Sequence, residues 1–448
     1  MIGRRLALAV VLALAALTAF AGQASATTVT RVFTSEPITV AGYSVLQDLT
    51  VNIPRPQGAG FITHMAADVV DLRTGAQVPI NRIMLHHIVF ADIGTPAAPL
   101  REAFYGDGEE RDTMDLPAGY GYPMPADHRW AMIWMLMNHR LQTDTVRIRW
   151  TLMWDTDPGL QPVVPMVFDA SHGRQGLVYD VAGGGAAGAT DVRTDTRPSP
   201  VSGRIVAGLG HVHGGAVGLT LSQPTCGDRV VYRARPTWGT AASPFYHVRP
   251  ILHEPGPINM SEIRTGQGIP VIAGQPLKLS SVYDATRPHT RVMGLMVAYI
   301  APDPTILDGC GAMPTDVQSI RTTTPGRAVA PVFTVPLTGL DASGHAVTIA
   351  RPPGATFVAA SAATVDVGDV FYARRNISIP QGGSVTWRFG GELAHDVTLA
   401  SGPRGFSSDQ LKGGGTWSRR FNVPGRYRIF CSLHPVQMTA VITVRPRR

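Results

Sequence analysis

The C-terminal part of the chain carries four side chains that could hold one metal ion. Cys431, His434 and Met438 stand close together in Cys-Ser-Leu-His-Pro-Val-Gln-Met, and His395 precedes them in Glu-Leu-Ala-His-Asp-Val. Thiolate and thioether sulfurs favour Cu(I), whereas imidazoles also tolerate Cu(II). The set therefore predicts a type 1 copper site that accepts and donates single electrons with little rearrangement.

Two other interpretations of these four residues remain open. Cys431 would be a buried core cysteine and the histidines ordinary loop residues, or the set would bind zinc. Structural zinc sites use closed sets of nitrogen and sulfur ligands without methionine. The order His, Cys, His, Met within a β-rich segment favours copper over both alternatives.

Three motifs in the first 300 residues offer further metal ligands. His86 and His87 are adjacent in an apolar segment. His211 and His213 stand two apart in Gly-His-Val-His-Gly, so on a strand they would share a face and could bind one metal ion. Met293 adds a thioether in a segment that we expect to be a strand. Two imidazoles and a thioether favour Cu(I), the form that reacts with O₂.

Each of these motifs also has a simpler explanation. Adjacent histidines arise by chance, and a lone methionine is more often a core residue. The acidic segment 107–112 is predicted to be a solvated loop. The sequence contains no Gly-Lys-Ser phosphate loop, no Gly-x-Ser-x-Gly elbow and no His-Glu-x-x-His motif. The joint presence of the three motifs upstream of a copper-type loop favours metal binding.

The first residues are typical of a secretory signal peptide. Arg4 and Arg5 precede an apolar run over residues 6–21, and small residues follow at 24–26. The run is shorter than the roughly 20 residues of a membrane span. We expect residues 1–26 to be removed and the protein to be exported, periplasmic or secreted, with no membrane span after cleavage. A retained membrane anchor is the alternative.

Composition narrows the class of protein further. The net charge is +7, but the arginines are scattered and only Lys278 and Lys412 are lysines, which argues against a nucleic-acid partner. If Cys431 binds copper, Cys226 and Cys310 remain. In an oxidising compartment this pair is expected to form a disulfide, with two free buried thiols as the alternative.

Alternating apolar and polar residues predict an all-β protein. The clearest examples are residues 145–154, 203–207 and 292–300, and about seven short strands follow from residue 365. A segment rich in Pro, Thr and Gly is expected to be a connector with some strand near residues 332–335. The predicted parts are the signal peptide 1–26, β domains 27–165 and 166–305, the connector 306–363 and the copper domain 364–448.

The copper domain resembles the cupredoxin family, which includes plastocyanin, pseudoazurin and amicyanin. The resemblance rests on Gly-Gly-Ser-Val-Thr-Trp at 382–387, His395-Asp-Val, Gly-Phe at 405–406 and Phe-Asn-Val-Pro-Gly-Arg-Tyr at 421–427. It implies a Greek-key sandwich in which His395, Cys431, His434 and Met438 bind one copper. Three residues separate His434 from Met438, a spacing that varies in the family and leaves the axial bond and the reduction potential open.

The preceding region resembles the type II copper monooxygenases, peptidylglycine α-hydroxylating monooxygenase and dopamine β-monooxygenase. The resemblance implies two jelly-roll-like β-sandwich domains that hold two further type 2-like coppers. The first copper would take His86, His87 and His139, and the second, catalytic copper would take His211, His213 and Met293. Leu209 stands where the peptide-hydroxylating enzyme has an arginine, and most of that family's disulfide framework is absent, so a peptidyl-glycine substrate is not expected.

Together these patterns predict an exported copper redox protein. Its type 1 copper would receive electrons from an external donor and feed a dicopper-type monooxygenase that hydroxylates a C–H bond of a small organic substrate with O₂. In the alternative, the protein is a non-catalytic electron-transfer protein in which only the cupredoxin site is redox active. A third hypothesis is a copper-handling protein that uses the His and Met sites for metal delivery.

Overall fold

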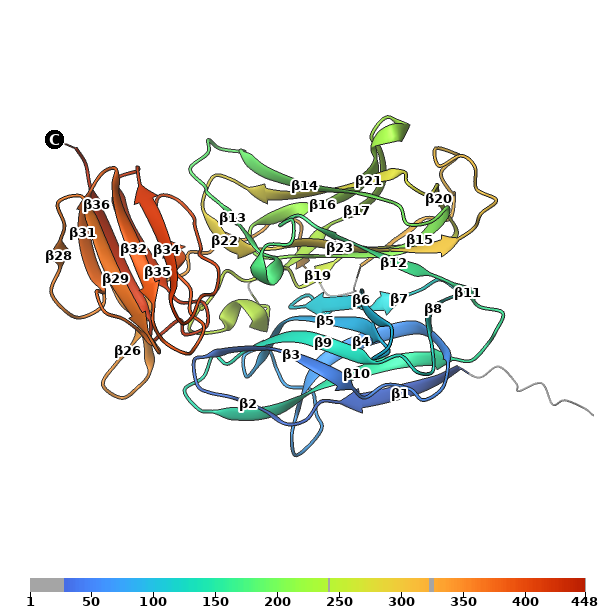
Figure 1. Ribbon diagram of the computed structural model, residues 1–448, viewed down its shortest axis with the longest axis horizontal. Coiled ribbons are helices and arrows are strands. Elements are labelled where there is room, and N and C mark those ends of the chain that lie inside the picture. Colours follow the sequence, from blue (N-terminus) through green and yellow to red (C-terminus); the bar gives the residue numbers. More distant parts are fainter. Residues whose placement is uncertain (1–27, 241, 322–325, 448) are drawn as a thin grey trace, which may run out of the picture.

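A computed structural model describes residues 28–240, 242–321 and 326–447. The predicted signal peptide lies outside the described residues. Within them the regular structure is β-strand apart from three short 3₁₀ helices, η1 (Gln175–Leu177), η2 (Pro224–Cys226) and η3 (Pro244–His247). Figure 1 shows two β-sandwiches stacked on one another and a third, C-terminal sandwich at their side. The predicted all-β class is confirmed.

The first sandwich packs two sheets, antiparallel except for the β8–β11 pair, around a core rich in aromatic residues, among them Trp130, Trp150 and Phe104. Its strands are β1 (Thr28–Thr34), β2 (Ile38–Val40), β3 (Val45–Ile53), β4 (Gly60–Asp71), β5 (Met84–Gly94), β6 (Pro99–Gly108), β7 (Met114–Asp115), β8 (Tyr120–Met124), β9 (Trp130–Met137), β10 (Asp144–Asp155) and β11 (Gln161–Pro162). One sheet has the order β1-β10-β4-β8-β11, with β2 and β7 at its margins, and the other has the order β3-β9-β5-β6.

The second sandwich follows directly along the chain. Its strands are β12 (Val164–Asp169), β13 (Tyr179–Val181), β14 (Thr190–Pro198), β15 (Gly203–Val212), β16 (Ala216–Gln223), β17 (Arg229–Ala234), β18 (Pro236–Gly239), β19 (Asn259–Met260), β20 (Glu262–Val271), β21 (Pro276–Asp284), β22 (His289–Val292), β23 (Gly294–Pro302), β24 (Gln318–Ile320) and β25 (Gly326–Arg327). The two large sheets have the orders β12-β23-β15-β20-β24 and β14-β21-β16-β17. Smaller sheets are β13-β22 and β19-β18-β25.

The sheet that contains β15 and β23 is shared between the two sandwiches. On β23, Met296 and Ala298 belong to the core of the second sandwich, while Val297 and Tyr299 belong to the core of the first. Side chains alternate between the faces of a strand, so β23 is buried on both faces rather than half-buried. The face of β15 that includes Leu209 likewise points toward the first sandwich, and His211 follows two residues later.

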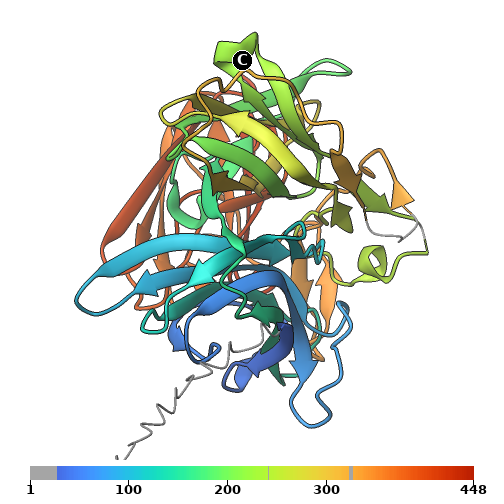
Figure 2. The same ribbon diagram turned by 90° about the vertical axis from the view of Figure 1, so that its right-hand side faces the viewer.

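The C-terminal sandwich begins after a hairpin formed by β26 and β27. The strands of this part are β26 (Thr338–Leu340), β27 (Ala346–Thr348), β28 (Phe357–Val358), β29 (Ala362–Gly368), β30 (Phe371–Tyr372), β31 (Asn376–Pro380), β32 (Gly383–Phe389), β33 (Thr398–Ser401), β34 (Gly415–Phe421), β35 (Gly425–Phe430) and β36 (Thr439–Arg445). The two sheets have the orders β28-β31-β36-β35-β33 and β30-β29-β32-β34. In Figure 2 this sandwich lies behind the other two.

Apolar contacts join the C-terminal sandwich to the rest of the protein. Val45, Met84 and Met137 of the first sandwich belong to the same buried cluster as Cys431 and Met438. The backbone N–H of Val45 also donates to the carbonyl of Leu433, at 3.2 Å. The loop that carries the C-terminal ligands therefore packs into the interior of the protein.

Two details of the sequence-based expectations are wrong. Residues 332–335 form no strand, because Pro331 and Pro336 on either side lack the amide hydrogen that a strand ladder requires. Met293 lies in a break between β22 and β23 rather than inside a strand.

The glycine-rich segment 183–188 connects β13 to β14 within the second sandwich. Among the described residues, no helix is long and apolar enough to cross a membrane.

Cys226 and Cys310 form a disulfide whose cysteines are 84 residues apart in sequence. Replacing both cysteines by serine is expected to lower the free energy of unfolding by about 2–4 kcal/mol, because the bond restricts a long loop in the unfolded chain. Urea unfolding of the double variant measures the loss. Since neither sulfur belongs to a predicted metal site, copper content should stay unchanged. An unaltered unfolding midpoint would contradict the expected contribution.

Candidate metal centres

The loop between β35 and β36 is closed by its own backbone hydrogen bonds. The N–H of His434 donates to the carbonyl of Cys431 at 3.1 Å, and the N–H of Met438 donates to the carbonyl of His434 at 3.0 Å. The N–H of Cys431 donates in turn to the carbonyl of Met438 at 3.0 Å. The loop therefore holds Cys431, His434 and Met438 around one point, and Cys431 and Met438 are fully buried.

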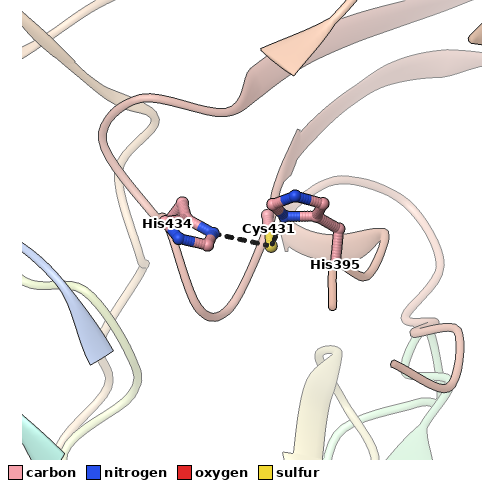
Figure 3. A group of neighbouring side chains, drawn as sticks. All are labelled: His395, Cys431 and His434. Carbon is pink, nitrogen blue, oxygen red and sulfur yellow. Dashed lines mark hydrogen bonds between the residues drawn. The ribbon is translucent and has the colours of Figure 1, made fainter. Parts of the chain in front are cut away.

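His395 completes a compact group with this loop, as Figure 3 shows. The Sγ of Cys431 lies 3.8 Å from Nδ1 of His395 and 3.9 Å from Nδ1 of His434. A metal ion about 2.3 Å from sulfur and about 2.0 Å from each nitrogen, with angles near 120°, would separate sulfur and nitrogen by about 3.8 Å. The backbone N–H of Val370 donates to Nε2 of His395 at 3.3 Å, which leaves Nδ1 facing the sulfur. The group thus fits a metal ion.

Asp396 forms hydrogen bonds with Cys431 and with its neighbouring residues. Its backbone N–H donates to Sγ of Cys431 at 3.5 Å. Its buried carboxylate accepts hydrogen bonds from the N–H of Ser432 at 2.9 Å, from the hydroxyl of Thr398 at 2.8 Å and from the hydroxyl of Ser432. Burial and the Asp396 charge raise the pKa of Cys431 to about 12, whereas burial lowers the pKa of His434 to about 4. The imidazole of His434 is available as a ligand, and binding of a metal ion to Cys431 would release the thiol proton.

A second group lies where β5 faces β15, and we call it the five-histidine cluster: His86, His87, His211, His213 and His253. The ring of His86 lies 4.9 Å from the rings of both His213 and His253, measured between centroids. The ring of His211 lies 5.1 Å from that of His213. The two histidine pairs that the sequence assigns to separate coppers are therefore brought together.

A β-bulge allows His86 and His87 to face the same point. Neighbouring residues of a regular strand point to opposite faces. Here Leu85 pairs with Leu136 and His87 pairs with Met135, so His86 is the extra residue of a bulge on β5. Bulges redirect side chains, often beside functional sites. The two Nδ1 atoms consequently lie 3.1 Å apart, close to the separation of two nitrogens that bind one metal at about 2.0 Å each.

Four cluster histidines are anchored through one ring nitrogen. Nδ1 of His211 bonds to Glu110, and Nδ1 of His213 donates to the carbonyl of Arg291 at 2.9 Å. Nε2 of His253 bonds to the carboxylate of Glu109, whose Oε1 also lies 3.5 Å from Nε2 of His86.

The opposite ring nitrogens of three cluster histidines are buried without a hydrogen-bond partner: Nε2 of His211, Nε2 of His213 and Nδ1 of His253. A buried polar atom without a partner is rare and destabilising. Histidines that bind metals are commonly held in this way, with the second nitrogen donating to a carboxylate or a carbonyl. Among the described residues, the ligand atoms at this cluster that lie within 4.8 Å of one another are those of His86, Glu109 and His253, and this group could hold a metal ion.

The acidic segment 107–112 was predicted to be a solvated loop, and this prediction is wrong. Asp107, Glu109, Glu110 and Asp112 are all buried. Gly108 on β6 pairs with His87 on β5. The turn after β6 therefore places Glu109 and Glu110 beside the histidines. Glu109 and Glu110 are partners of imidazoles, whereas Asp107 accepts from the backbone N–H of Asp112, and Asp112 accepts from Asn259 and from the N–H of Met260. His253, to which the sequence assigns no role, belongs to the same arrangement through its contact with Glu109.

Burial sets the electrostatics of the cluster. Burial together with neighbouring histidines holds the pKa of His86 and of His213 well below the usual range, and it lowers the pKa of His87 to about 3. Burial also acts to lower the pKa of His211, but Glu110 outweighs it and the pKa is raised. Most of the cluster is thus neutral, with nitrogen lone pairs available, and Glu110 increases the basicity of His211 as a ligand.

The other two predicted ligands lie at the edge of this group. The ring of His139 is 6.2 Å from that of His253, and its Nδ1 donates to the carbonyl of Pro250 at 3.0 Å, leaving a buried, unpartnered Nε2. Met293 is buried and lines the same cavity as His211 and His213. The hydroxyl of Tyr283 connects them, since it accepts from the N–H of His213 and donates to the carbonyl of Met293.

A cavity of about 1000 Å³ extends from the cluster to the C-terminal sandwich. His87 and Met293 line it on one side, and Leu399, Phe430 and Ser432 line it on the other. Ser432 is the direct neighbour of Cys431. The cavity therefore borders the five-histidine cluster and reaches the residue next to the ligand Cys431, and most of its remaining lining is apolar.

Gly108 provides a test of the cluster. A Cβ at this position would lie 2.7 Å from Cε1 of His211 and 2.8 Å from the carbonyl of His86, so these groups would have to move. Gly108→Ala is expected to weaken copper binding at the cluster by at least about tenfold, as loss of a supporting contact does. Gly106→Ala on the same strand is the control, because its Cβ would approach no atom closer than 3.3 Å. Copper titration measures both, and equal affinities would contradict the assignment.

Comparison with known proteins bears on the C-terminal part. Amicyanin of Paracoccus versutus is 29% identical over 128 residues, which are 28% of this chain and 97% of that protein. Amicyanin-alpha of Methylorubrum extorquens is 29% identical over 86 residues, or 18% of this chain and 72% of that protein. A purple cupredoxin of Nitrosopumilus maritimus with a solved structure is 26% identical and covers 18% of this chain and 98% of that one, with a TM-score of 0.17. No protein-family model matches the chain.

These relatives and the ligand geometry define a cupredoxin domain at the C-terminus. They support a copper electron-transfer protein, in agreement with the coarser part of the prediction from sequence. The comparisons do not bear on the two preceding sandwiches.

Proposed function

We propose that the protein binds copper at the five-histidine cluster as well, and that the type 1 site supplies this second centre with electrons. The observation that carries the proposal is the pattern of buried donor atoms. His211, His213 and His253 each have one anchored nitrogen and one buried nitrogen without a partner. Without a bound metal ion, these atoms would either stay unpaired at a free-energy cost or have to bind water from the adjoining cavity.

The activity we propose is that of a copper monooxygenase that hydroxylates a C–H bond of a small organic substrate. Copper bound at the cluster would supply the one-electron chemistry that lets O₂ react with such a bond. The chain contributes the imidazoles, the carboxylates of Glu109 and Glu110 that orient them, and the largely apolar cavity that excludes water from a substrate. Met293 and His139 are the proposed additional ligands at the edge of the cluster.

Export belongs to the same proposal. A disulfide and a copper thiolate site suit an oxidising compartment outside the cytoplasm. Mass spectrometry of the protein isolated from its producing cells would give the start of the mature chain, which we expect at Thr27. We keep 27–165, 166–305, 306–363 and 364–448 as the proposed domain boundaries.

Copper analysis combined with EPR tests the proposed function. We expect more than one copper per mature chain, up to three, with a type 1 signal and at least one further copper that His213→Ala removes. Addition of a reductant should then start O₂ consumption that depends on the cluster. One copper per chain with only the type 1 signal would refute the proposal and favour the non-catalytic electron-transfer protein.

A further inference from the structure

Arg291 lies between the two candidate centres in an unusual backbone conformation. Its φ is +53°, in the left-handed region that a non-glycine residue rarely adopts. The conformation is fixed on both sides, because the N–H of Arg291 donates to Asp180 at 3.0 Å and its carbonyl accepts from Nδ1 of His213 at 2.9 Å. Residues held in such regions cluster at functional sites.

The side chain of Arg291 reaches the cupredoxin domain. Its Nη1 lies 3.7 Å from Oδ2 of Asp396 and donates to the carbonyl of Ser408 at 3.2 Å. The Arg291 side chain is 14% exposed and that of Asp396 is fully buried, so the pair is shielded from water. Asp396 follows the ligand His395 directly in sequence, and its N–H donates to Sγ of Cys431 at 3.5 Å.

These contacts form a continuous route between the centres. It runs from Cys431 to the backbone of Asp396, through the carboxylate to the guanidinium of Arg291, and along Arg291 to its carbonyl and the ring of His213. Electron tunnelling decays less through covalent and hydrogen bonds than through empty space. The contact of Arg404 with the carbonyl of Gly183 at the same interface leads to neither set of ligands.

We propose that the Arg291–Asp396 pair is the electron relay from the type 1 site to the five-histidine cluster; this inference rests on the proposed copper at the cluster. One electron leaves the type 1 site, where Cu(I) becomes Cu(II), and reduces copper at the cluster from Cu(II) to Cu(I). No bond breaks and no proton moves between the centres. The two residues are positioning residues: Arg291 fixes His213 through its carbonyl and couples it to the Cys431 loop through its charge.

The test compares the rate of intramolecular electron transfer in Arg291→Met with that of the unaltered protein. The variant removes the contact with Asp396 but keeps the backbone carbonyl that holds His213. After rapid reduction of the type 1 site without O₂, its visible absorption should return about tenfold more slowly, the size of effect typical of a lost supporting contact. Copper content and the EPR signals of both centres should stay unchanged, which a merely structural defect would not allow.

Three further variants make the result decisive. Arg404→Met removes an arginine from the same interface and should transfer electrons at the unaltered rate. Arg291→Lys keeps a cation near Asp396 and should recover part of the rate, and Arg291→Gln replaces Arg291→Met if the latter does not fold.

An unaltered rate in the Arg291 variants, with both coppers present, would overturn the relay and leave the proposed function standing. A protein that binds only the type 1 copper would instead overturn the proposed function, and the relay with it.

Discussion

Cys431→Ser is expected to abolish the visible absorption of the protein and its ability to accept electrons, while copper remains bound at the five-histidine cluster. The thiolate is the soft ligand that stabilises Cu(I) at the type 1 site. A serine hydroxyl in the same buried position would neither ionise nor bind copper well. His395 and His434 would then be left with Met438 as a weak set.

The expected loss is measured by absorption spectroscopy, EPR and copper analysis of the same preparation. The double variant Cys226→Ser, Cys310→Ser is the matched control, because it removes the other two cysteines of the chain without touching a predicted copper ligand. It should keep the full visible absorption. Persisting type 1 absorption in Cys431→Ser would show that another residue provides the sulfur ligand and would overturn the assignment of the loop.

The type 1 site was predictable because it is largely local. Three of its ligands lie on one loop of eight residues, and the hydrogen bonds that shape the loop join Cys431, His434 and Met438 to one another. The flanking strands also show their alternation in sequence, as in β32, where Val385 and Trp387 are buried. The copper loop therefore needed little information about the rest of the fold.

The five-histidine cluster was predictable only in part, because it is built from distant segments. The spacing of His211 and His213 and the pair His86-His87 are visible in sequence. Glu109 and His253 are 144 residues apart in sequence, and no local sequence pattern predicts their contact. A charged run normally stays in water, so only the fold shows that Glu109 and its neighbours are buried against imidazoles.

The sequence also did not predict that the two histidine pairs lie together. A bulge at His86 has no sequence signature, yet it turns His86 and His87 toward one point. The sheet shared by both sandwiches brings His211 on β15 to the first sandwich, where the carboxylate of Glu110 meets it. Sequence resemblance supplied ligands for two centres, but the packing of β15 against the first sandwich determines that they lie together.

His213→Ala is expected to remove the copper of the five-histidine cluster and any O₂ consumption, while the type 1 absorption persists. His213 offers a buried, unpartnered Nε2, and its ring lies beside those of His86 and His211. Even a lost supporting contact weakens metal binding by about 10–100-fold, so loss of a ligand should cost more. The removed ring also leaves a cavity that water can enter, which makes the remaining set less favourable for copper.

Copper titration and EPR of His213→Ala measure this loss, and O₂ electrode traces follow the consumption. His345→Ala is the matched control, since the side chain of His345 is 62% exposed and contacts Asp341 in the hairpin of β26 and β27. Its copper content should equal that of the unaltered protein. If His213→Ala and His345→Ala retain the same copper, the cluster binds no metal, and its unpartnered nitrogens must be satisfied by water in the cavity. The electrons of the type 1 site would then have to leave the protein for an external acceptor.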